Sequence, residues 1–442
     1  MAAPVTTNGR SAGMFQQFFR WEAAGGVVLL FCAVTGLVWA NSPWADSYFA
    51  LSKTDIGISW GDHTFKLSLS HWIADGLMVI FFFVVGLEIK REVVVGELSS
   101  FKQAILPVSA AVGGMIVPAI LYAVLTFGGE GARGWGIPMA TDIAFALGIL
   151  ALFGSRAPTS LKVFLTALAI ADDLGAITVI ALFYTESMSF VALGVAAALL
   201  VGIVLAGRRG IRSTSVYLLL AVGVWAAILA SGIHATIAGV LLAMVVPVKA
   251  ALEPREFLSR SRKRLAELEE AELTRDSMVS DKEQMDALDD MYLAVEDMRP
   301  VGISLEHLLH PIQAFLILPV FALFMAGVPL GGDSTGVLAS TVSLGVIAGL
   351  VIGKPVGIML CVWLVIKSGR AALPGDMTWG HLLGASMLAG VGFTMSIFIS
   401  NLAFPYDEAL IGQAKVGVLL ASVVAGVIGF VILNKSLPAA SK

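Results

Sequence analysis

Charged residues are scarce in this sequence. Asp, Glu, Lys and Arg make up 14% of its 442 residues and hydrophobic residues 57%, whereas soluble domains carry about 25% charged residues. The deficit excludes a soluble globular domain and predicts an all-α polytopic membrane protein. The net charge is only -4, and acids and bases are segregated by region. The total charge therefore indicates no partner, and no nucleic acid is expected.

Cysteine is nearly absent as well. Cys32 and Cys361 each lie inside an apolar run, where packing thiols are the ordinary interpretation, so no disulfide is predicted. The N-terminal residues 1–20 lack a short apolar core followed by a small-residue cleavage site, so no removable signal is expected. We expect the first apolar run to anchor the chain itself.

Long apolar runs fill most of the sequence. Because about 20 apolar residues cross a bilayer as a helix, we predict about 12 transmembrane helices, near residues 23–41, 71–89, 103–127, 136–154, 163–185, 188–206, 214–230, 234–247, 303–327, 338–366, 379–403 and 408–434. With a cytoplasmic N-terminus, about 23 Lys and Arg residues fall on the cytoplasmic side and about 3 on the other. Both termini are therefore predicted to be cytoplasmic, and residues 1–442 to form a single membrane domain.

Ionisable residues inside three of these runs are the candidate functional residues. Asp172 and Asp173 lie in the run Leu168–Ile177, Asp142 follows Thr141, and Lys354 lies in Gly-Lys-Pro. Burying a charged side chain in the interior of a bilayer costs free energy, so an ionisable residue there is expected to have a function. Two desolvated carboxylates repel each other, so the site would hold either protons or a small hard cation such as Na⁺ or Li⁺, which prefers oxygen ligands.

Asp172 and Asp173 point about 100° apart on a helix, so we expect different roles for them. Asp173 is predicted to face the cation and Asp172 to lie near Lys354, in an ion pair that opens when the cation enters. A buried pair that only locks the fold is the structural alternative. Lys354 is also a candidate carrier of a transported proton. Thr141 is either a cation ligand or a hydroxyl bonded to its own helix.

Two predicted spans, near 136–154 and 379–403, are interrupted by Gly or Pro. Broken spans at matching positions in two halves indicate inverted repeats with the binding site at the breaks. Asp142 would then offset the positive helix ends and Lys354 the negative ones. The alternative for Asp142 is a simple helix cap.

Two segments outside the apolar runs carry further predictions. Alternation around a turn in residues 56–69 predicts an extracytoplasmic β-hairpin, which either makes a homodimer contact or lies on its own helices. The polar insertion at about 251–300 predicts two amphipathic cytoplasmic helices, roughly Pro254–Leu273 and Asp281–Met298. A regulatory or partner-binding role and contact with anionic lipid remain open for this insertion.

Charged residues near the ends of the spans have alternative interpretations. Glu88 and Glu92 share a helix face and form either an acidic mouth that attracts cations or an interfacial cluster with Lys90 and Arg91. Asp75 either lines an outer funnel or caps its helix.

The histidines lie near span ends. His234 begins span eight on the outer side, and His307 and His310 start span nine beside Glu306. A pH-sensing role, a metal site and satisfied interfacial histidines are the three interpretations of the inner cluster.

Six segments together resemble the bacterial Na⁺/H⁺ antiporters of the NhaA type: 140–148, 168–177, 231–236, 305–311, 352–357 and 392–398. The resemblance implies a twelve-helix homodimer of the bacterial inner membrane that exports Na⁺ or Li⁺ against inward proton flow, electrogenically and under pH control. It implies Asp172 and Asp173 as the ion-binding acids, Asp142 and Lys354 as the groups that stabilise crossed broken helices, and the hairpin as the dimer arm. Positions matching Glu88, Glu92, Glu306 and His307 belong to that family's funnel and pH response. The insertion is longer than in compact members.

The alternatives within transport are an exchanger of other selectivity, such as K⁺/H⁺, and a Na⁺-coupled symporter. From other classes, an intramembrane aspartyl protease would need its two acids on separate facing helices, and a retinal pump would need a different number of spans. We therefore expect a transporter rather than an enzyme, with no cofactor beyond the transported ions.

Overall fold

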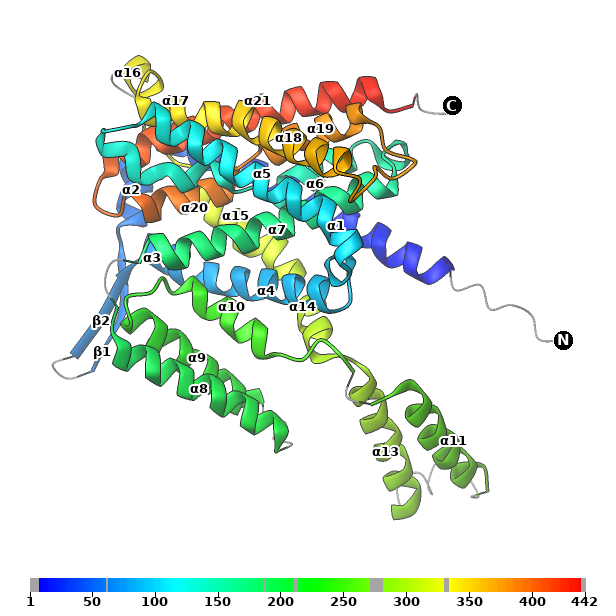
Figure 1. Cartoon of the computed structure of the whole chain (residues 1–442). Coiled ribbons are helices and arrows are strands. Elements are labelled where there is room, and N and C mark those ends of the chain that lie inside the picture. The colour runs from blue at the N-terminus through cyan, green and yellow to red at the C-terminus, as the bar shows by residue number, and fades with distance from the viewer. Residues whose placement is uncertain are drawn as a thin grey trace.

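The computed structural model describes residues 8–60, 63–185, 188–209, 214–250, 252–270, 281–329 and 334–438, and most of them are helical (Figure 1). The start of α1, the end of α21 and the helices α11 and α13 lie at one end of the helical bundle, and strands β1 and β2 lie at the opposite end (Figure 1). The prediction of a largely helical polytopic membrane protein is confirmed.

Seven helices within the described residues are long and apolar enough to cross a membrane. Three of them are continuous combinations of several segments: α3 (Leu69–His71), η1 (Trp72–Leu77) and α4 (Met78–Val94); α14 (Val301–Ile312), η5 (Gln313–Ile317) and α15 (Leu318–Met325); and α17 (Thr341–Ala348), η6 (Gly349–Gly353) and α18 (Lys354–Lys367). The other four are α5 (Phe101–Leu125), α7 (Thr159–Phe183), α8 (Phe190–Arg208) and α21 (Glu408–Ser436).

Three further pairs of helices are apolar but bent at a short break. The first joins α1 (Asn8–Ala40) to α2 (Ala45–Ser52) with a bend of 113°. The second joins η3 (Glu130–Met139) to α6 (Ile143–Ala151) at 41°, and the third joins α19 (Trp379–Ala389) to α20 (Phe393–Ala403) at 43°. The last two breaks fall in the segments predicted to be interrupted, at residues 140–142 and 390–392.

Shorter elements complete the description. Two apolar helices too short for the same criterion, α9 (Thr214–Ala230) and α10 (Thr236–Val245), precede the insertion. Single turns connect the longer elements: η2 (Glu97–Ser99), η4 (Gly154–Arg156) and α16 (Ser334–Leu338). Strands β1 (Asp55–Trp60) and β2 (His63–Ser68) pair antiparallel, with Asp55 opposite Ser68.

Proline explains two of the π-helical segments. Pro319 and Pro355 lie inside long helices, and each follows a π segment, η5 and η6. A proline cannot donate a backbone N–H, and its ring collides with the carbonyl four residues earlier, which for these two prolines falls within the π segment. The wider turn of a π segment accommodates that carbonyl without breaking the helix. In η6 this adjustment fixes the position of Lys354, the next residue.

Glycine allows two helix pairs to approach closely. Helices α5 and α18 cross where Gly113 and Gly357 face each other, and a Cβ on either glycine would overlap the other's carbonyl oxygen. Gly239 of α10 meets the backbone of α4 at Val79 in the same way. The first crossing matters for the site because α18 begins at Lys354.

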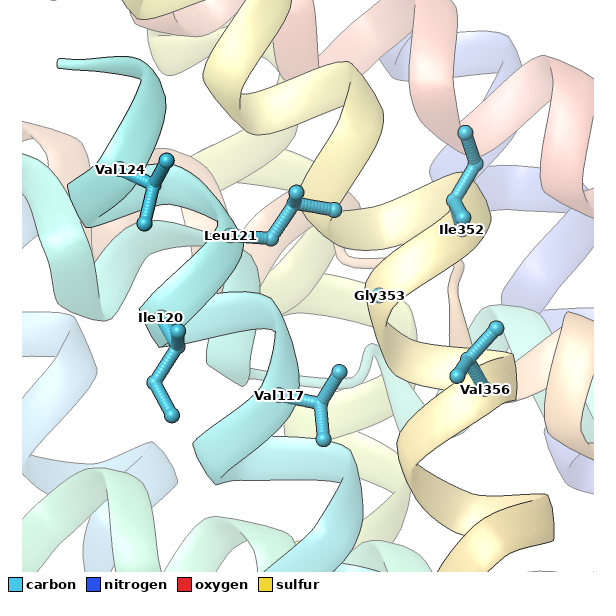
Figure 2. A pocket seen from close by; sticks show the side chains of 7 residues that line it. All are labelled: Val117, Ile120, Leu121, Val124, Ile352, Gly353 and Val356. Atoms are coloured by element: carbon cyan, nitrogen blue, oxygen red, sulfur yellow. The ribbon is translucent and has the colours of Figure 1, made fainter.

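An apolar groove lies beside this crossing, between α5 and the η6–α18 segment (Figure 2). Its volume is about 410 Å³ and its lining is entirely apolar: Val117, Ile120, Leu121, Val124, Ile352, Gly353 and Val356. Ile120 and Val124 are more than half exposed, as expected for side chains that face lipid. With no polar group in its lining, the groove offers a cation no ligand.

Replacing Gly357 by valine will force α5 and α18 apart, because the new side chain meets the backbone of Gly113. Overpacking of this kind costs about 1–3 kcal/mol, so the midpoint of thermal unfolding in detergent will fall. Gly194→Val on α8 is the matched control, since no heavy atom lies within 4 Å of a Cβ at Gly194. Equal midpoints for the two variants would contradict the close contact.

Two helices occupy the predicted insertion, α11 (Pro254–Glu270) and α13 (Lys282–Met298). Residues 271–273 of the first predicted helix lie outside the described residues. Arg264 and Asp290 join the two helices with an N–O distance of 2.5 Å, and the guanidinium holds the pKa of Asp290 below its ordinary value. This pair therefore contributes to stability at neutral pH, and its contribution is lost only as acid protonates Asp290.

Candidate functional site at the crossing of two broken helices

The two helix breaks meet in the interior of the bundle. The backbone N–H of Asp142, in the first break, donates to the carbonyl of Val391, in the second, at 2.7 Å. The hydroxyl of Ser396 on α20 donates to the carbonyl of Ile137 on η3 at 2.8 Å. The backbone of the first break is extended at Ala140 and Asp142, whereas Gly390 and Gly392 of the second break keep helical backbone angles. In both breaks the helical hydrogen-bond pattern is interrupted, so amides and carbonyls at the ends of the half-helices must be satisfied by another group.

Asp142 satisfies amides at the starts of two helices. One carboxylate oxygen, Oδ1, accepts from the N–H of Phe145 at the start of α6, at 3.0 Å. The other, Oδ2, accepts from the N–H of Thr394 in the first turn of α20 at 3.0 Å and from its hydroxyl at 2.5 Å. A single negative charge thus lies at the positive ends of both half-helices. Asp142 therefore caps its own helix, α6, as the simpler alternative holds, and it also binds the first turn of α20.

Lys354 lies at the opposite kind of helix end, where carbonyl groups are left without helical partners. Its side chain is completely buried, and its ammonium donates to the carbonyl of Met139, the last residue of η3. The same nitrogen lies 2.7 Å from Oδ2 of Asp172 on α7, and both side chains have 0% exposure. A positive charge therefore lies at the negative end of one half-helix while it pairs with an acid.

Thr141 lies between Asp172 and the second broken helix. Its hydroxyl oxygen is 2.6 Å from Oδ2 of Asp172 and 2.9 Å from the carbonyl oxygen of Ala389 at the end of α19. A hydroxyl has one proton, so it serves one of these acceptors at a time and leaves its own lone pairs available to a ligand.

Asp173 lies in a different environment from Asp172, although the two are adjacent. The charged groups that act on it are three acids, Asp172, Glu88 and Asp142, and one base, Lys354. Asp173 is 2% exposed and Asp172 is 1% exposed. Within the described part of the chain, Oδ1 of each aspartate is buried without a hydrogen-bond partner.

This donor set suits a small hard cation. An unpartnered buried carboxylate oxygen costs free energy unless a proton or cation occupies it. Two such oxygens, with the Thr141 hydroxyl and the Ala389 carbonyl close to Asp172, are the ligand types that alkali cations take. The site can therefore hold either a cation or protons, and each would displace the other.

A cluster of charged residues, on segments predicted to lie on the inner side, joins α4 to α14. Arg91 lies 2.8 Å from Glu306 and 3.1 Å from Glu92, and Glu88 is buried one turn earlier in α4. His307 is exposed. Within the described ranges, no group of three or more His, Cys, Asp and Glu residues is placed to hold a metal ion, which removes support for a metal site at the histidine pair.

At the end of the bundle next to strands β1 and β2, which is predicted to be the outer end, His234 and Asp75 lie together. Nε2 of His234 is 3.2 Å from Oδ1 of Asp75, and its Nδ1 is 2.9 Å from the hydroxyl of Thr236. The ring of His234 packs edge-on against Phe398 of α20. Asp75 therefore pairs across two spans and does not only cap its own helix.

Several groups of the site were not anticipated from the sequence. Thr394 and Ser396 follow the second break but carry no charge in an apolar run. The two glycines of the break and the resemblance of residues 392–398 singled out the segment, but neither gave these two side chains a role. The carbonyls of Met139 and Ala389 are backbone groups, which no residue type indicates. The pairing of Arg91 with Glu306 joins two spans that are far apart in the sequence.

These features define a polytopic membrane transporter whose ionisable residues are buried where two broken helices cross. Comparison with known proteins gives the family. The family model for Na⁺/H⁺ antiporter 1 matches residues 16–433. The chain belongs to that family, and the resemblance drawn from its motifs is confirmed.

Individual relatives are similar over almost their whole length. The chain is 47% identical to the Na(+)/H(+) antiporter NhaA of Oleidesulfovibrio alaskensis, covering 95% of this chain and 93% of the relative. It is 47% identical to the protein of the same name from Koribacter versatilis, with 95% and 90% covered. It is 43% identical to the Na(+)/H(+) antiporter NhaA 2 of Helicobacter hepaticus, with 98% of each chain covered.

Proposed function

We propose that this protein exports Na⁺ or Li⁺ across the bacterial inner membrane in exchange for protons. The observation that carries the proposal is the pair of buried, unpartnered carboxylate oxygens of Asp172 and Asp173 beside the crossing of the breaks. The names of the relatives, all Na⁺/H⁺ antiporters, support the same ions. No cofactor takes part beyond the transported ions.

Exchange follows from competition for the same oxygens. In the proton-loaded form, Asp173 carries a proton and Asp172 pairs with Lys354. When a cation enters from the cytoplasm, Asp173 loses its proton and Asp172 turns from Lys354 to the cation. The loaded forms reorient between the two sides, whereas the empty form does not, because it would bury the charged carboxylate of Asp173 without a proton or a cation.

Lys354 gives the exchange its electrogenic character. One proton per Na⁺ would move no net charge, so electrogenic exchange needs at least one more proton for each cation. When the cation separates Asp172 from Lys354, the buried ammonium loses its counter-ion and can release that second proton. Lys354 is thus both the donor to the free carbonyl of Met139 at the helix break and a proton carrier.

The proposed membrane topology follows from the distribution of basic residues along the chain. We assign twelve crossings in two inverted repeats, with the η3–α6 and α19–α20 pairs as the broken helices. The start of α1, the end of α21 and the insertion lie on the cytoplasmic side, where the basic residues are concentrated. The β1–β2 hairpin on the outer side makes the contact of a homodimer.

The inner cluster is the proposed site of pH control. Glu88 and Glu92 attract cations to the cytoplasmic mouth, and the Arg91–Glu306 pair ties the end of α4 to α14. Protonation of Glu306 or His307 changes the charge at that contact, and the position of α4 changes with it. His234 and Asp75 form a second contact between a histidine and an acid, at the outer end.

Everted membrane vesicles test the function directly. A proton gradient is formed, and Na⁺, Li⁺ or K⁺ is then added across a range of pH. We expect Na⁺ and Li⁺ to dissipate the gradient and K⁺ to leave it unchanged. Dissipation by K⁺ alone would replace the proposal with a K⁺/H⁺ exchanger, and a response to none of the ions would reject cation/proton exchange.

The alternative of an intramembrane aspartyl protease finds less support. Such an enzyme needs two facing acids that share a water molecule, whereas Asp172 is paired with a lysine and a threonine.

A further inference from the structure

The insertion between α10 and α14 has an outer face that transport does not require. Helices α11 and α13 pack side by side (Figure 1), with Leu268, Ala287 and Ala294 buried between or beside them. Asp290 pairs with both Arg260 and Arg264 at 3.3 and 2.5 Å. Buried apolar side chains and ion pairs therefore occupy the sides of α11 and α13 that face each other.

Apolar side chains on both helices remain exposed. On α11, Leu258 and Leu265 are 52% and 49% exposed and are separated by about two turns, so they share one face. Four of the five exposed large apolar side chains of α13 recur every three or four residues and form one stripe, Met285, Leu288, Tyr292 and Val295, and the fifth, Leu293, lies on another side of the helix. Around each helix, taken in the direction of the chain, the exposed set follows the side that packs on the partner helix. Because α11 and α13 run antiparallel, the two sets then lie on the same face of the hairpin.

Two arginines edge this apolar face. Arg255 and Arg262 are exposed and lie three and four residues from Leu258, just beyond it around α11. Glu269 lies at the far end of the same face, away from the start of the helix. Along α11 the face thus alternates arginine and leucine, which is typical of a helix that lies in a membrane interface.

The base of the hairpin is closed by two backbone hydrogen bonds. The N–H of Leu252 donates to the carbonyl of Asp297 at 3.2 Å, and the N–H of Gly302 donates to the carbonyl of Pro247 at 2.9 Å. Helix α10 ends at Val245 and α14 begins at Val301, so few residues separate the hairpin from the spans on either side. The leaflet from which these spans emerge is therefore within reach of both helices.

We propose that this face of the α11–α13 hairpin docks on anionic phospholipid in the leaflet from which α10 and α14 emerge. The leucine and α13 side chains enter the interface, and Arg255 and Arg262 bind lipid phosphates while their stems cover apolar surface. A lipid surface fits better than a second copy of the chain, because it lies beside the hairpin in every molecule and supplies the charge opposite to the two arginines.

Fluorescence quenching in nanodiscs that hold one protomer tests the docking. In a background with Cys32→Ser and Cys361→Ser, bimane is attached at Leu288→Cys on the apolar face or, as the matched control, at Asp286→Cys, an exposed position on the other side of α13. Acrylamide quenching is compared in discs of phosphatidylcholine with and without phosphatidylglycerol. We expect phosphatidylglycerol to protect the label at 288 and to leave quenching at 286 unchanged.

The arginines provide the second comparison. Each basic residue near an anionic leaflet shifts docking about fivefold, so Arg255→Gln with Arg262→Gln will lower the ratio of docked to undocked hairpin about thirtyfold and remove the effect of phosphatidylglycerol. Equal quenching at 288 and 286 in every disc would overturn the proposal. Protection that appears only with two protomers per disc would overturn it in favour of contact between copies. Because the readout is not transport, either failure leaves the proposed exchange untouched.

Discussion

Asp173→Asn will abolish Na⁺-dependent proton movement in everted vesicles. The amide has nearly the same shape as the carboxylate but can neither bind a proton at ordinary pH nor bring a negative charge to the cation. The substitution also removes one acid from the cluster of Asp172, Glu88 and Asp142, so the variant is expected to insert and remain folded. The rate of proton movement on addition of Na⁺ is the measurement.

The control for this variant is Asp46→Asn, which replaces an exposed acid on α2 and will leave exchange intact. Size-exclusion chromatography of both variants separates a loss of ion binding from a loss of folding. Normal Na⁺/H⁺ exchange by Asp173→Asn would exclude Asp173 as the ligand.

Lys354→Met will destabilise the protein strongly, even though methionine fills much of the same space. The change leaves Asp172 buried without its counter-ion and the carbonyl of Met139 without its donor. Removing one partner of a buried ion pair costs about 3–5 kcal/mol. The midpoint of thermal unfolding in detergent will therefore fall well below that of the unmodified protein.

A double variant makes this prediction specific. Lys354→Met together with Asp172→Asn removes both charges, and such replacements are often close to neutral. The double variant will therefore unfold at a higher temperature than Lys354→Met alone, although it will not exchange cations because Asp172 has lost its charge. A double variant that is less stable than Lys354→Met would mean that the loss of the Lys354–Asp172 ion pair does not explain the destabilisation.

The apolar runs and the buried acids could be predicted from the sequence because each follows from composition alone. An aspartate inside a run long enough to cross a bilayer needs a reason, and Asp142, Asp172 and Asp173 stand out without any alignment. The interruptions near residues 140 and 391 were also visible, since Gly and Pro weaken a helix wherever they occur.

The contacts that complete the site could not be predicted in the same way. A threonine in an apolar run normally bonds to its own helix, so nothing in the sequence indicates that Thr394 donates to Asp142 on another span. The same holds for the carbonyl of Met139, which Lys354 satisfies only because the end of η6 and the end of η3 come together in space. These contacts depend on how the spans pack, and sequence patterns of single spans do not specify packing.

The central claim is that protons and alkali cations compete for the carboxylates of Asp172 and Asp173. Titrating purified protein with Na⁺ in a calorimeter, in buffers of different ionisation enthalpy, counts the protons released as Na⁺ binds. We predict proton release on binding, an apparent Na⁺ affinity that weakens as the pH falls, and no such signal from Asp173→Asn. Binding of Na⁺ without release of protons at any pH would contradict the account.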